Sequence, residues 1–172
     1  MNKKIALVGA SSVGKTTVYE LLKTKLPGYD FKNESTRTIA NYGFPINEKG
    51  TSETQLAISS FHLEALLTTK DTVYDRCYLD LIVYSSYIES ISPQAFRYIE
   101  DTWTRVRSYY THFIYFPIEF KSVDDGVRSV NEEWRHEVDQ LFQSMLIKGG
   151  IDYLKITGSP NERVKQILNY IQ

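Results

Sequence analysis

Eight consecutive residues near the N-terminus combine two glycines, a lysine and a hydroxyl residue at a spacing suited to phosphate binding. They fit G-x-x-x-x-G-K-[ST] at every fixed position and read Gly9, Ala10, Ser11, Ser12, Val13, Gly14, Lys15 and Thr16. Glycines let a backbone curl round phosphate oxygens, and successive N–H groups attract negative charge. We therefore predict that the segment from Gly9 to Thr17 binds the phosphates of ATP, in preference to GTP.

Two side chains of this segment have separate chemical roles. Lys15 should bridge the β- and γ-phosphates as a catalytic residue, and the Thr16 hydroxyl should bind Mg²⁺. Asp75 and Arg76 follow a β-rich run, so they should project at the carboxyl edge of a sheet, where open α/β folds bind ligands. There Asp75 could be a catalytic carboxylate that holds Mg²⁺, and Arg76 could clamp a phosphate. The alternative for this pair is an ion pair at a helix end.

The phosphate loop needs a strand before it and a helix after it, and the sequence supplies both. Residues 5–8 form an apolar run typical of a strand buried on both faces, and helical spacing begins at Lys15. Further strands are predicted at about residues 29–34, 72–74, 112–118 and 153–156. Because strands alternate with helices, we predict an α/β fold: a three-layer α/β/α sandwich with a five-stranded parallel sheet.

Polar residues mark the starts of four further helices. Ser52 with Gln55 and Ser159 with Glu162 fit capping boxes, Pro93 follows a capping Ser92, and Asn131 can cap a helix. In the helix after Ser52, four leucines are predicted to supply the apolar contacts: Leu56, Leu63, Leu66 and Leu67.

Length and composition limit the classes of protein that this chain can be. Its 172 residues are 42% hydrophobic and 24% charged, which indicates one soluble domain spanning residues 1–172. The net charge of -1 provides no overall basic field for nucleic acid or anionic membrane. No segment approaches the roughly 20 apolar residues that cross a bilayer. Cys77 is the only cysteine, so an intrachain disulfide is excluded and the cytoplasm is expected.

The segment that follows the third predicted strand resembles a known family. Residues 75–87 read D-R-C-Y-L-D-L-I-V-Y-S-S-Y and are similar to the D-R-x-x-x-D/S-x-x-x-Y segment of thymidylate kinases, deoxynucleoside kinases and bacterial nicotinamide riboside kinase domains. The whole chain is most similar to small P-loop proteins of the nicotinamide riboside kinase-like group, which include phage enzymes. Thymidylate kinases usually carry proline where Ser35 follows Glu34, which argues against thymidylate as the acceptor.

The resemblance implies which residues bind the acceptor of the phosphoryl group: Glu34, Arg37, Arg76 and Tyr84. If the acceptor is a hydroxyl, Glu34 is the candidate catalytic base. If the acceptor is a phosphate, no base is needed and Arg37 or Arg76 would hold it. The alternative for Glu34 is a carboxylate stabilised by a helix N-terminus.

The family also places an arginine-bearing lid after the fourth strand, here at about residues 119–136. Arg128 and Arg135 are seven residues apart, so they would share one side of a helix and reach the transferring phosphoryl group as catalytic residues. Gly126 would be the hinge. The alternative is a charged face exposed to solvent.

Three functions compete on this evidence. The first is an ATP- and Mg²⁺-dependent kinase of a nucleoside, a nucleoside monophosphate or a related hydroxyl compound. The second is a kinase of hydroxymethylated pyrimidines in DNA, for which a basic and aromatic surface could form from Arg97, Arg105, Arg107, Tyr109 and Tyr110. The third is a nucleotide-dependent switch or ATPase, but the N-K-x-D of GTPases is absent from the sequence.

Three minor features complete the expectations. The three histidines lack ligand spacing and Cys77 is expected to be a small buried residue, so we predict no structural metal. A nucleotide donor and a small acceptor are the expected partners, with DNA not favoured. The oligomeric state stays open, with a homodimer among the alternatives.

Overall fold

The computed structural model describes residues 2–122 and 131–172, and a five-stranded sheet lies at its centre. Every neighbouring pair of strands is parallel, in the order β2-β3-β1-β4-β5. The strands are β1 (Lys4–Val8), β2 (Asp30–Lys32), β3 (Thr72–Asp75), β4 (His112–Tyr115) and β5 (Tyr153–Lys155). Leu7 pairs with Asp75 and Val8 with Tyr115, so the central strands end at one edge. The predicted parallel sheet is confirmed.

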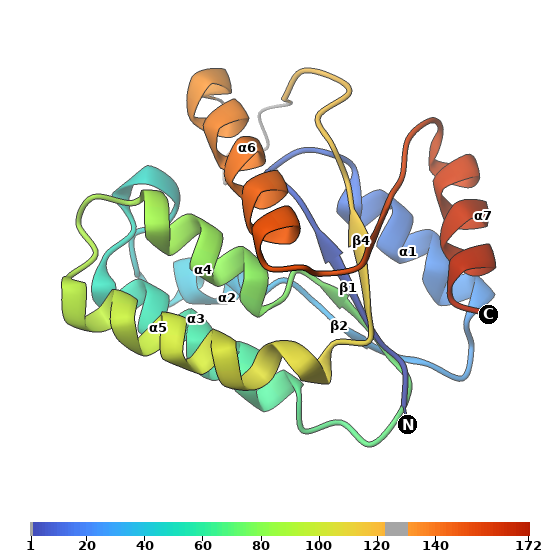
Figure 1. The fold of residues 1–172 in the computed structure, drawn as a ribbon, viewed down its shortest axis with the longest axis horizontal. Coiled ribbons are helices and arrows are strands. Elements are labelled where there is room, and N and C mark those ends of the chain that lie inside the picture. The colour runs from blue at the N-terminus through green and yellow to red at the C-terminus, as the bar shows by residue number, and fades with distance from the viewer. Residues whose placement is uncertain (1, 123–130) are drawn as a thin grey trace.

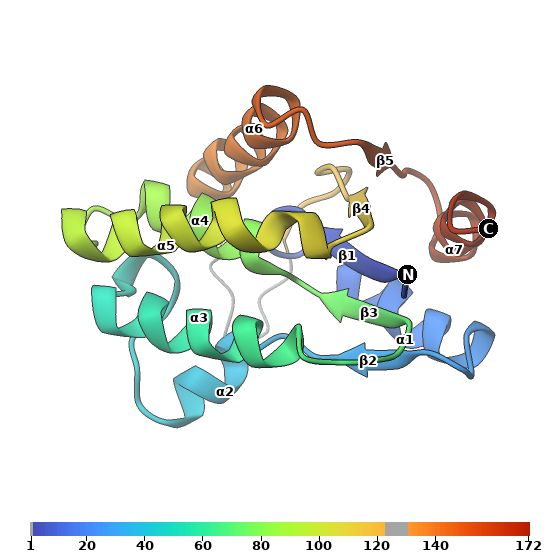
Figure 2. The ribbon, with the colours of Figure 1, turned by 60° about the horizontal axis from the view of Figure 1, so that its bottom comes forward.

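Helices cover both faces of this sheet (Figures 1 and 2). α1 and α7 lie together on one face, and α3, α4, α5 and α6 lie over the other. All residues of β1 are buried, as expected of a strand enclosed by two layers. The bounds are α1 (Lys15–Lys25), α2 (Thr36–Asn41), α3 (Ser52–Ala65), α4 (Tyr78–Tyr87), α5 (Pro93–Val106), α6 (Glu132–Lys148) and α7 (Pro160–Tyr170), with 3₁₀ turns η1 (Asn47–Lys49) and η2 (Arg107–Tyr109). The three-layer sandwich is confirmed.

Most predicted helix starts are confirmed, but the predicted N-cap of α3 was wrong by one residue. Asn131 and Ser92 accept hydrogen bonds from the backbone N–H three residues on, and Ser159 forms the predicted capping box. At α3 the cap is Thr51, whereas the Ser52 hydroxyl accepts a hydrogen bond from the Ser92 N–H. Two adjacent hydroxyl residues were both competent caps, and the contact with Ser92 takes the second one.

The leucines of α3 divide differently from the prediction. Leu66 is buried and Leu63 packs against the core, as expected. Leu56 and Leu67 are 37% and 78% exposed, so the prediction that they supply core contacts was wrong. The buried side of the helix is instead partly polar and includes Gln55, Ser59 and His62. The prediction rested on the apolar residues of this helix alone and so did not include its buried polar face.

α4 begins with an unusual cap that fixes the residues after β3. The Cys77 N–H donates to the Asp80 carboxylate at 2.9 Å, and Leu79 N–H donates to Cys77 Sγ. Cys77 is fully buried, as predicted, and burial raises the pKa of its thiol, so it is no ready nucleophile. In the described ranges, no helix is both long and apolar enough to span a bilayer.

Candidate active site

The loop between β1 and α1 adopts the conformation that phosphate binding requires. Gly9 and Gly14 have φ angles of 139° and 87°, and Ser12 is left-handed at 55°. A Cβ at Gly9 would lie 2.5 Å from the carbonyl oxygen of Phe116, the residue after β4, so only glycine fits there. The curl follows from these residues and from the close approach of the neighbouring strand.

Lys15 lies folded over this loop. Its Nζ donates to the carbonyl oxygens of Gly9 and Ala10 at 2.8 and 2.6 Å. Burial and, to a smaller extent, the nearby Arg76 cation lower the pKa of Lys15 to about 7, although the nearby carboxylates act in the opposite direction. An anion with more negative charge than two carbonyls would draw this ammonium away from them.

Thr16 and Asp75, the two residues predicted to hold Mg²⁺, are in contact, although they come from different elements. The Thr16 hydroxyl donates to the Asp75 carboxylate at 3.0 Å. A hydroxyl oxygen and a carboxylate oxygen side by side fit the ligand preference of Mg²⁺. Both line a pocket of about 300 Å³ together with loop residues 12–17, Glu34 and Arg76. We call this hollow the donor pocket.

Arg76 is the most constrained charged residue of the site. Its φ is 78°, a strained value for an arginine. Its Nε donates to Glu34 at 2.6 Å, its Nη1 lies 3.3 Å from Asp80, and its guanidinium lies over the Tyr84 ring. Burial raises the pKa of Asp80 to about 6, and the Arg76 cation opposes that rise. The alternative predicted for this segment, an ion pair at a helix end, is therefore present, and it lies within the site.

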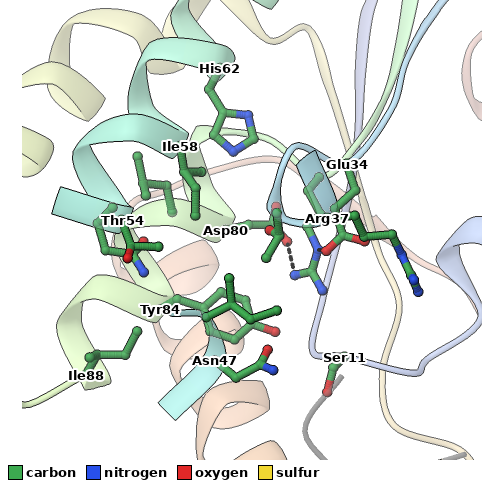
Figure 3. Close-up of a pocket in the computed structure, with 15 residues that line it drawn as sticks. Ser11, Glu34, Arg37, Asn47, Thr54, Ile58, His62, Asp80, Tyr84 and Ile88 are labelled. Atoms are coloured by element: carbon green, nitrogen blue, oxygen red, sulfur yellow. Dashed lines mark hydrogen bonds and ion pairs between the residues drawn. The ribbon is translucent and has the colours of Figure 1, made fainter. Parts of the chain in front are cut away.

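A second pocket of about 670 Å³, partly open to solvent, adjoins the first (Figure 3). All four residues predicted for the acceptor, Glu34, Arg37, Arg76 and Tyr84, line it. Its other walls come from η1, α3 and α4 and include Asn47, Thr54, Gln55, Ile58, His62 and Asp80. We call it the acceptor pocket.

The two pockets share one wall. Glu34 and Arg76 line both of them, so their ion pair stands between the phosphate loop and the acceptor pocket. In the described parts of the chain, the non-glycine residues with positive φ are Ser12, Asn47 and Arg76, and each lines one or both pockets. Backbone strain concentrated in this way is typical of functional sites.

Sequence reasoning did not identify the individual residues that α3 supplies to the acceptor pocket. Thr54, Ile58 and His62 are spaced by four residues, so they line one side of the helix. That spacing was the available signal, but the histidines were considered only as metal ligands. Burial lowers the pKa of His62 to about 4, so the imidazole is neutral at pH 7.

The structure describes only one of the two predicted lid arginines. Arg128 and the hinge Gly126 lie outside the described residues. Arg135 is fully buried in α6, and its guanidinium donates to the carbonyl oxygens of Ser11 and Ser12. The structure thus places Arg135 behind the phosphate loop, and its direct contact with a transferring phosphoryl group stays a prediction.

The basic and aromatic surface considered for DNA is smaller than expected. Tyr109 is 54% exposed, but Tyr110 is buried against Tyr74 and Phe113, and its hydroxyl accepts from the Tyr78 N–H. Tyr110 therefore belongs to the core and cannot stack on a base. Arg97, Arg105 and Arg107 remain exposed.

The parallel sheet, the curled loop and the adjoining acceptor pocket define the class of P-loop proteins with a kinase fold. The sequence model of the AAA domain family matches residues 4–163, so the chain belongs to that family. The sheet order and the loop confirm the expected P-loop kinase fold. No curated protein matches the chain.

Solved structures share this fold at low sequence identity. A deoxyadenosine kinase from M. mycoides with dCMP and dCDP superposes with a TM-score of 0.76 at 16% identity, covering 98% of this chain and 97% of the other. A NadR protein in complex with NR gives a TM-score of 0.80 at 16% identity, covering 98% of this chain but only 51% of NadR. The YorR protein of Bacillus subtilis gives 0.60 at 16% identity, covering 98% and 95%.

Proposed function

We propose that this protein is an ATP- and Mg²⁺-dependent kinase that transfers the γ-phosphoryl group to a hydroxyl of a nucleoside. The observation that carries the proposal is the wall of Glu34 and Arg76 shared by the donor and acceptor pockets. An acceptor and the end of a bound triphosphate would meet at that wall, which is the arrangement that direct transfer requires. A switch or simple ATPase has no use for the second pocket.

The charges of the acceptor pocket favour a neutral acceptor over a monophosphate. Two cations, Arg37 and Arg76, face two carboxylates, Glu34 and Asp80, and His62 is neutral at pH 7. The formal sum of these four charges is zero, and Arg76 is already engaged by both carboxylates. A nucleoside would add no charge to this balanced set, whereas a phosphate dianion would leave the pocket with a net formal charge of about -2. The similar structures named for a deoxyadenosine kinase and for NadR with NR agree with a nucleoside.

Each residue then has a definite task. The loop N–H groups and Lys15 bind the donor phosphates, and Thr16 and Asp75 would hold Mg²⁺, which neutralises charge on the phosphates when bound. Glu34 accepts the proton of the attacking hydroxyl, and Arg76 keeps its carboxylate in place at 2.6 Å. The predicted lid at about residues 119–136, with Arg128, would stabilise the transferred charge.

The experiment that tests this proposal offers γ-labelled ATP and Mg²⁺ to a panel of acceptors. The panel contains nucleosides, nucleoside monophosphates, nicotinamide riboside and hydroxymethylated DNA, and the Lys15→Ala variant is the control. We expect labelled nucleoside monophosphate, formed from the nucleoside acceptor, with wild-type protein and none with the variant. Label that appears only as free phosphate, whatever the acceptor, would refute the kinase. Labelled nucleoside diphosphate or labelled DNA instead would redirect the proposal to a monophosphate or a DNA acceptor.

A further inference from the structure

Two buried arginines grip the outer side of the phosphate loop. Arg135 of α6 donates from Nε to the Ser11 carbonyl at 2.9 Å and from Nη2 to the Ser12 carbonyl at 3.2 Å. Arg163 of α7 donates from Nη1 to the Val13 carbonyl at 2.7 Å. These arginines are 0% and 2% exposed, so both contacts are shielded from water. Three successive carbonyl oxygens of the loop thus accept hydrogen bonds from guanidinium groups.

This grip decides where the loop N–H groups point. In a trans peptide the carbonyl and the following N–H point in opposite directions. With the carbonyls of residues 11–13 turned outward, the N–H groups of Ser12, Val13 and Gly14 turn inward, toward the hollow that Lys15 covers. A row of inward N–H groups is the arrangement that binds phosphate.

The strained conformation of Ser12 requires such a restraint. Its φ of 55° is left-handed, which is strained for a non-glycine residue. Strained residues persist where surrounding contacts over-determine them. The hydrogen bonds of Arg135 to the carbonyls of Ser11 and Ser12 flank this residue and supply that determination.

Each arginine is itself held in place by a carboxylate and by the segment after β4. Arg135 pairs with Glu132 at 2.9 Å and also donates to the Phe120 carbonyl. Hydrogen bonds from Ser122 lower the pKa of Glu132 to about 2, so this partner stays charged. Arg163 pairs with Glu119, and its guanidinium lies near the Phe120 ring. Both arginines are therefore fixed by further contacts in addition to those that they make with the loop.

We propose that Arg135 and Arg163 are positioning residues that hold the loop N–H groups toward the donor phosphates without contacting the nucleotide. We call these two arginines the brace. The inference rests on the proposed function only in placing donor phosphates in this loop. It assigns Arg163, which the sequence did not single out, and it gives Arg135 a task different from that of a lid arginine.

The first test compares ADP affinity in the presence of Mg²⁺, measured by calorimetry on the intact protein. Loss of one charged hydrogen-bond donor should weaken ADP binding about 10- to 100-fold in Arg135→Gln and in Arg163→Gln. Arg105→Gln is the matched control, because it removes an exposed cation of α5 and should leave the affinity unchanged. Unchanged ADP affinity in both brace variants would overturn the inference.

A second variant separates positioning from simple structural support. Glycine adopts positive φ without strain, so Ser12→Gly should recover about fivefold of the ADP affinity lost in Arg135→Gln. The same substitution should recover nothing in Arg163→Gln, whose lost contact is at Val13. Equal recovery in both backgrounds, or none in either, would contradict the role of Arg135 at Ser12.

A measurement on wild-type protein keeps the test decisive if the variants do not fold. With Mg²⁺ and a non-hydrolysable ATP analogue, the amide resonances of Ser12, Val13 and Gly14 should shift. No scalar coupling should join the guanidinium nitrogens of Arg135 or Arg163 to phosphorus. Such a coupling would make these arginines phosphate ligands and overturn the inference.

These outcomes are distinguishable from failure of the proposed kinase. Wild-type protein that binds ADP with the expected variant losses, but labels no acceptor, would refute the kinase alone. Protein that labels an acceptor, with ADP affinity unaffected by either arginine, would refute the brace alone. Wild-type protein that does not bind ADP would overturn both.

Discussion

The donor and acceptor pockets lie side by side but are built in different ways. The donor pocket consists mainly of consecutive residues 12–17, to which Glu34, Asp75 and Arg76 are added. The acceptor pocket gathers side chains from α2, η1, α3 and α4, between residues 34 and 88, with Ser11 as its one contribution from the loop. One pocket depends on local conformation and the other on how distant helices pack.

This difference determines what each pocket tolerates. A glycine such as Gly9 cannot change, because any Cβ meets the Phe116 carbonyl oxygen at 2.5 Å. The side chains of α3 that face the acceptor pocket, Thr54, Ile58 and His62, carry no such backbone constraint. We therefore expect substitutions to separate donor binding from acceptor binding, and four predictions test that separation.

The largest effect is expected where the pockets meet. Arg76→Gln leaves the carboxylates of Glu34 and Asp80 without their common partner. Losing one member of a buried charge pair costs several kcal/mol, so kcat/KM for the acceptor should fall about 10³-fold. ADP affinity should change only about twofold, because the brace and the loop N–H groups remain. A loss of ADP affinity as large as the loss in kcat/KM would erase the proposed separation.

Glu34→Gln tests whether the acceptor needs a base. The amide keeps the shape of the side chain but cannot take a proton, so kcat should fall about 10²-fold or more. ADP affinity should stay unchanged, and Glu20→Gln on the exposed face of α1 provides the matched control. Activity retained in Glu34→Gln would point to a phosphate acceptor and a structural carboxylate.

The pH dependence of ADP binding probes the donor side. The pKa of Lys15 is about 7 in the free protein, and bound phosphates raise it, so binding takes up a proton above pH 7. Affinity should therefore fall as the pH rises from 7.5 to 9, by at most about tenfold per pH unit. Calorimetry in buffers of different ionisation enthalpy measures the proton uptake, which Lys15→Ala should abolish. Proton release on binding would contradict the assignment.

The smallest expected effect compares two helix caps. Thr51→Ala and Ser159→Ala each remove an N-cap, and each should lower the free energy of unfolding by about 1 kcal/mol. Thr51 also lies 3.3 Å from the Thr54 hydroxyl of the acceptor pocket, so only its loss should raise the acceptor KM, about twofold. Equal acceptor KM values in Thr51→Ala and Ser159→Ala would show that loss of the α3 cap leaves acceptor binding unchanged.

The same contrast explains how much the sequence could predict. The phosphate loop and the sheet were predictable because glycine spacing and strand periodicity are local. Glu34, Arg37 and Tyr84 were found through a resemblance and Arg76 through its place after a predicted strand, and all four line one pocket. The contribution of Thr54, Ile58 and His62 was missed, because it depends on how α3 packs against α4.

Two further misses have the same physical origin. At α3 the sequence offered two adjacent capping residues, and a contact with Ser92, 40 positions away, decided between them. The charge of Arg135 was visible, but the direction in which α6 docks was not, and that direction points the guanidinium at the back of the loop. Long-range packing therefore decides which of several locally adequate roles a residue takes.

The wall that both pockets share has a thermodynamic consequence. A ligand in either pocket changes the electric field at Glu34 and Arg76, and thereby the free energy of binding in the other. Linkage requires the two effects to be equal, so a nucleoside that tightens ADP binding must itself bind more tightly when ADP is present. Because of the shared wall, a change in ligand affinity at one pocket therefore reports whether the other pocket is occupied.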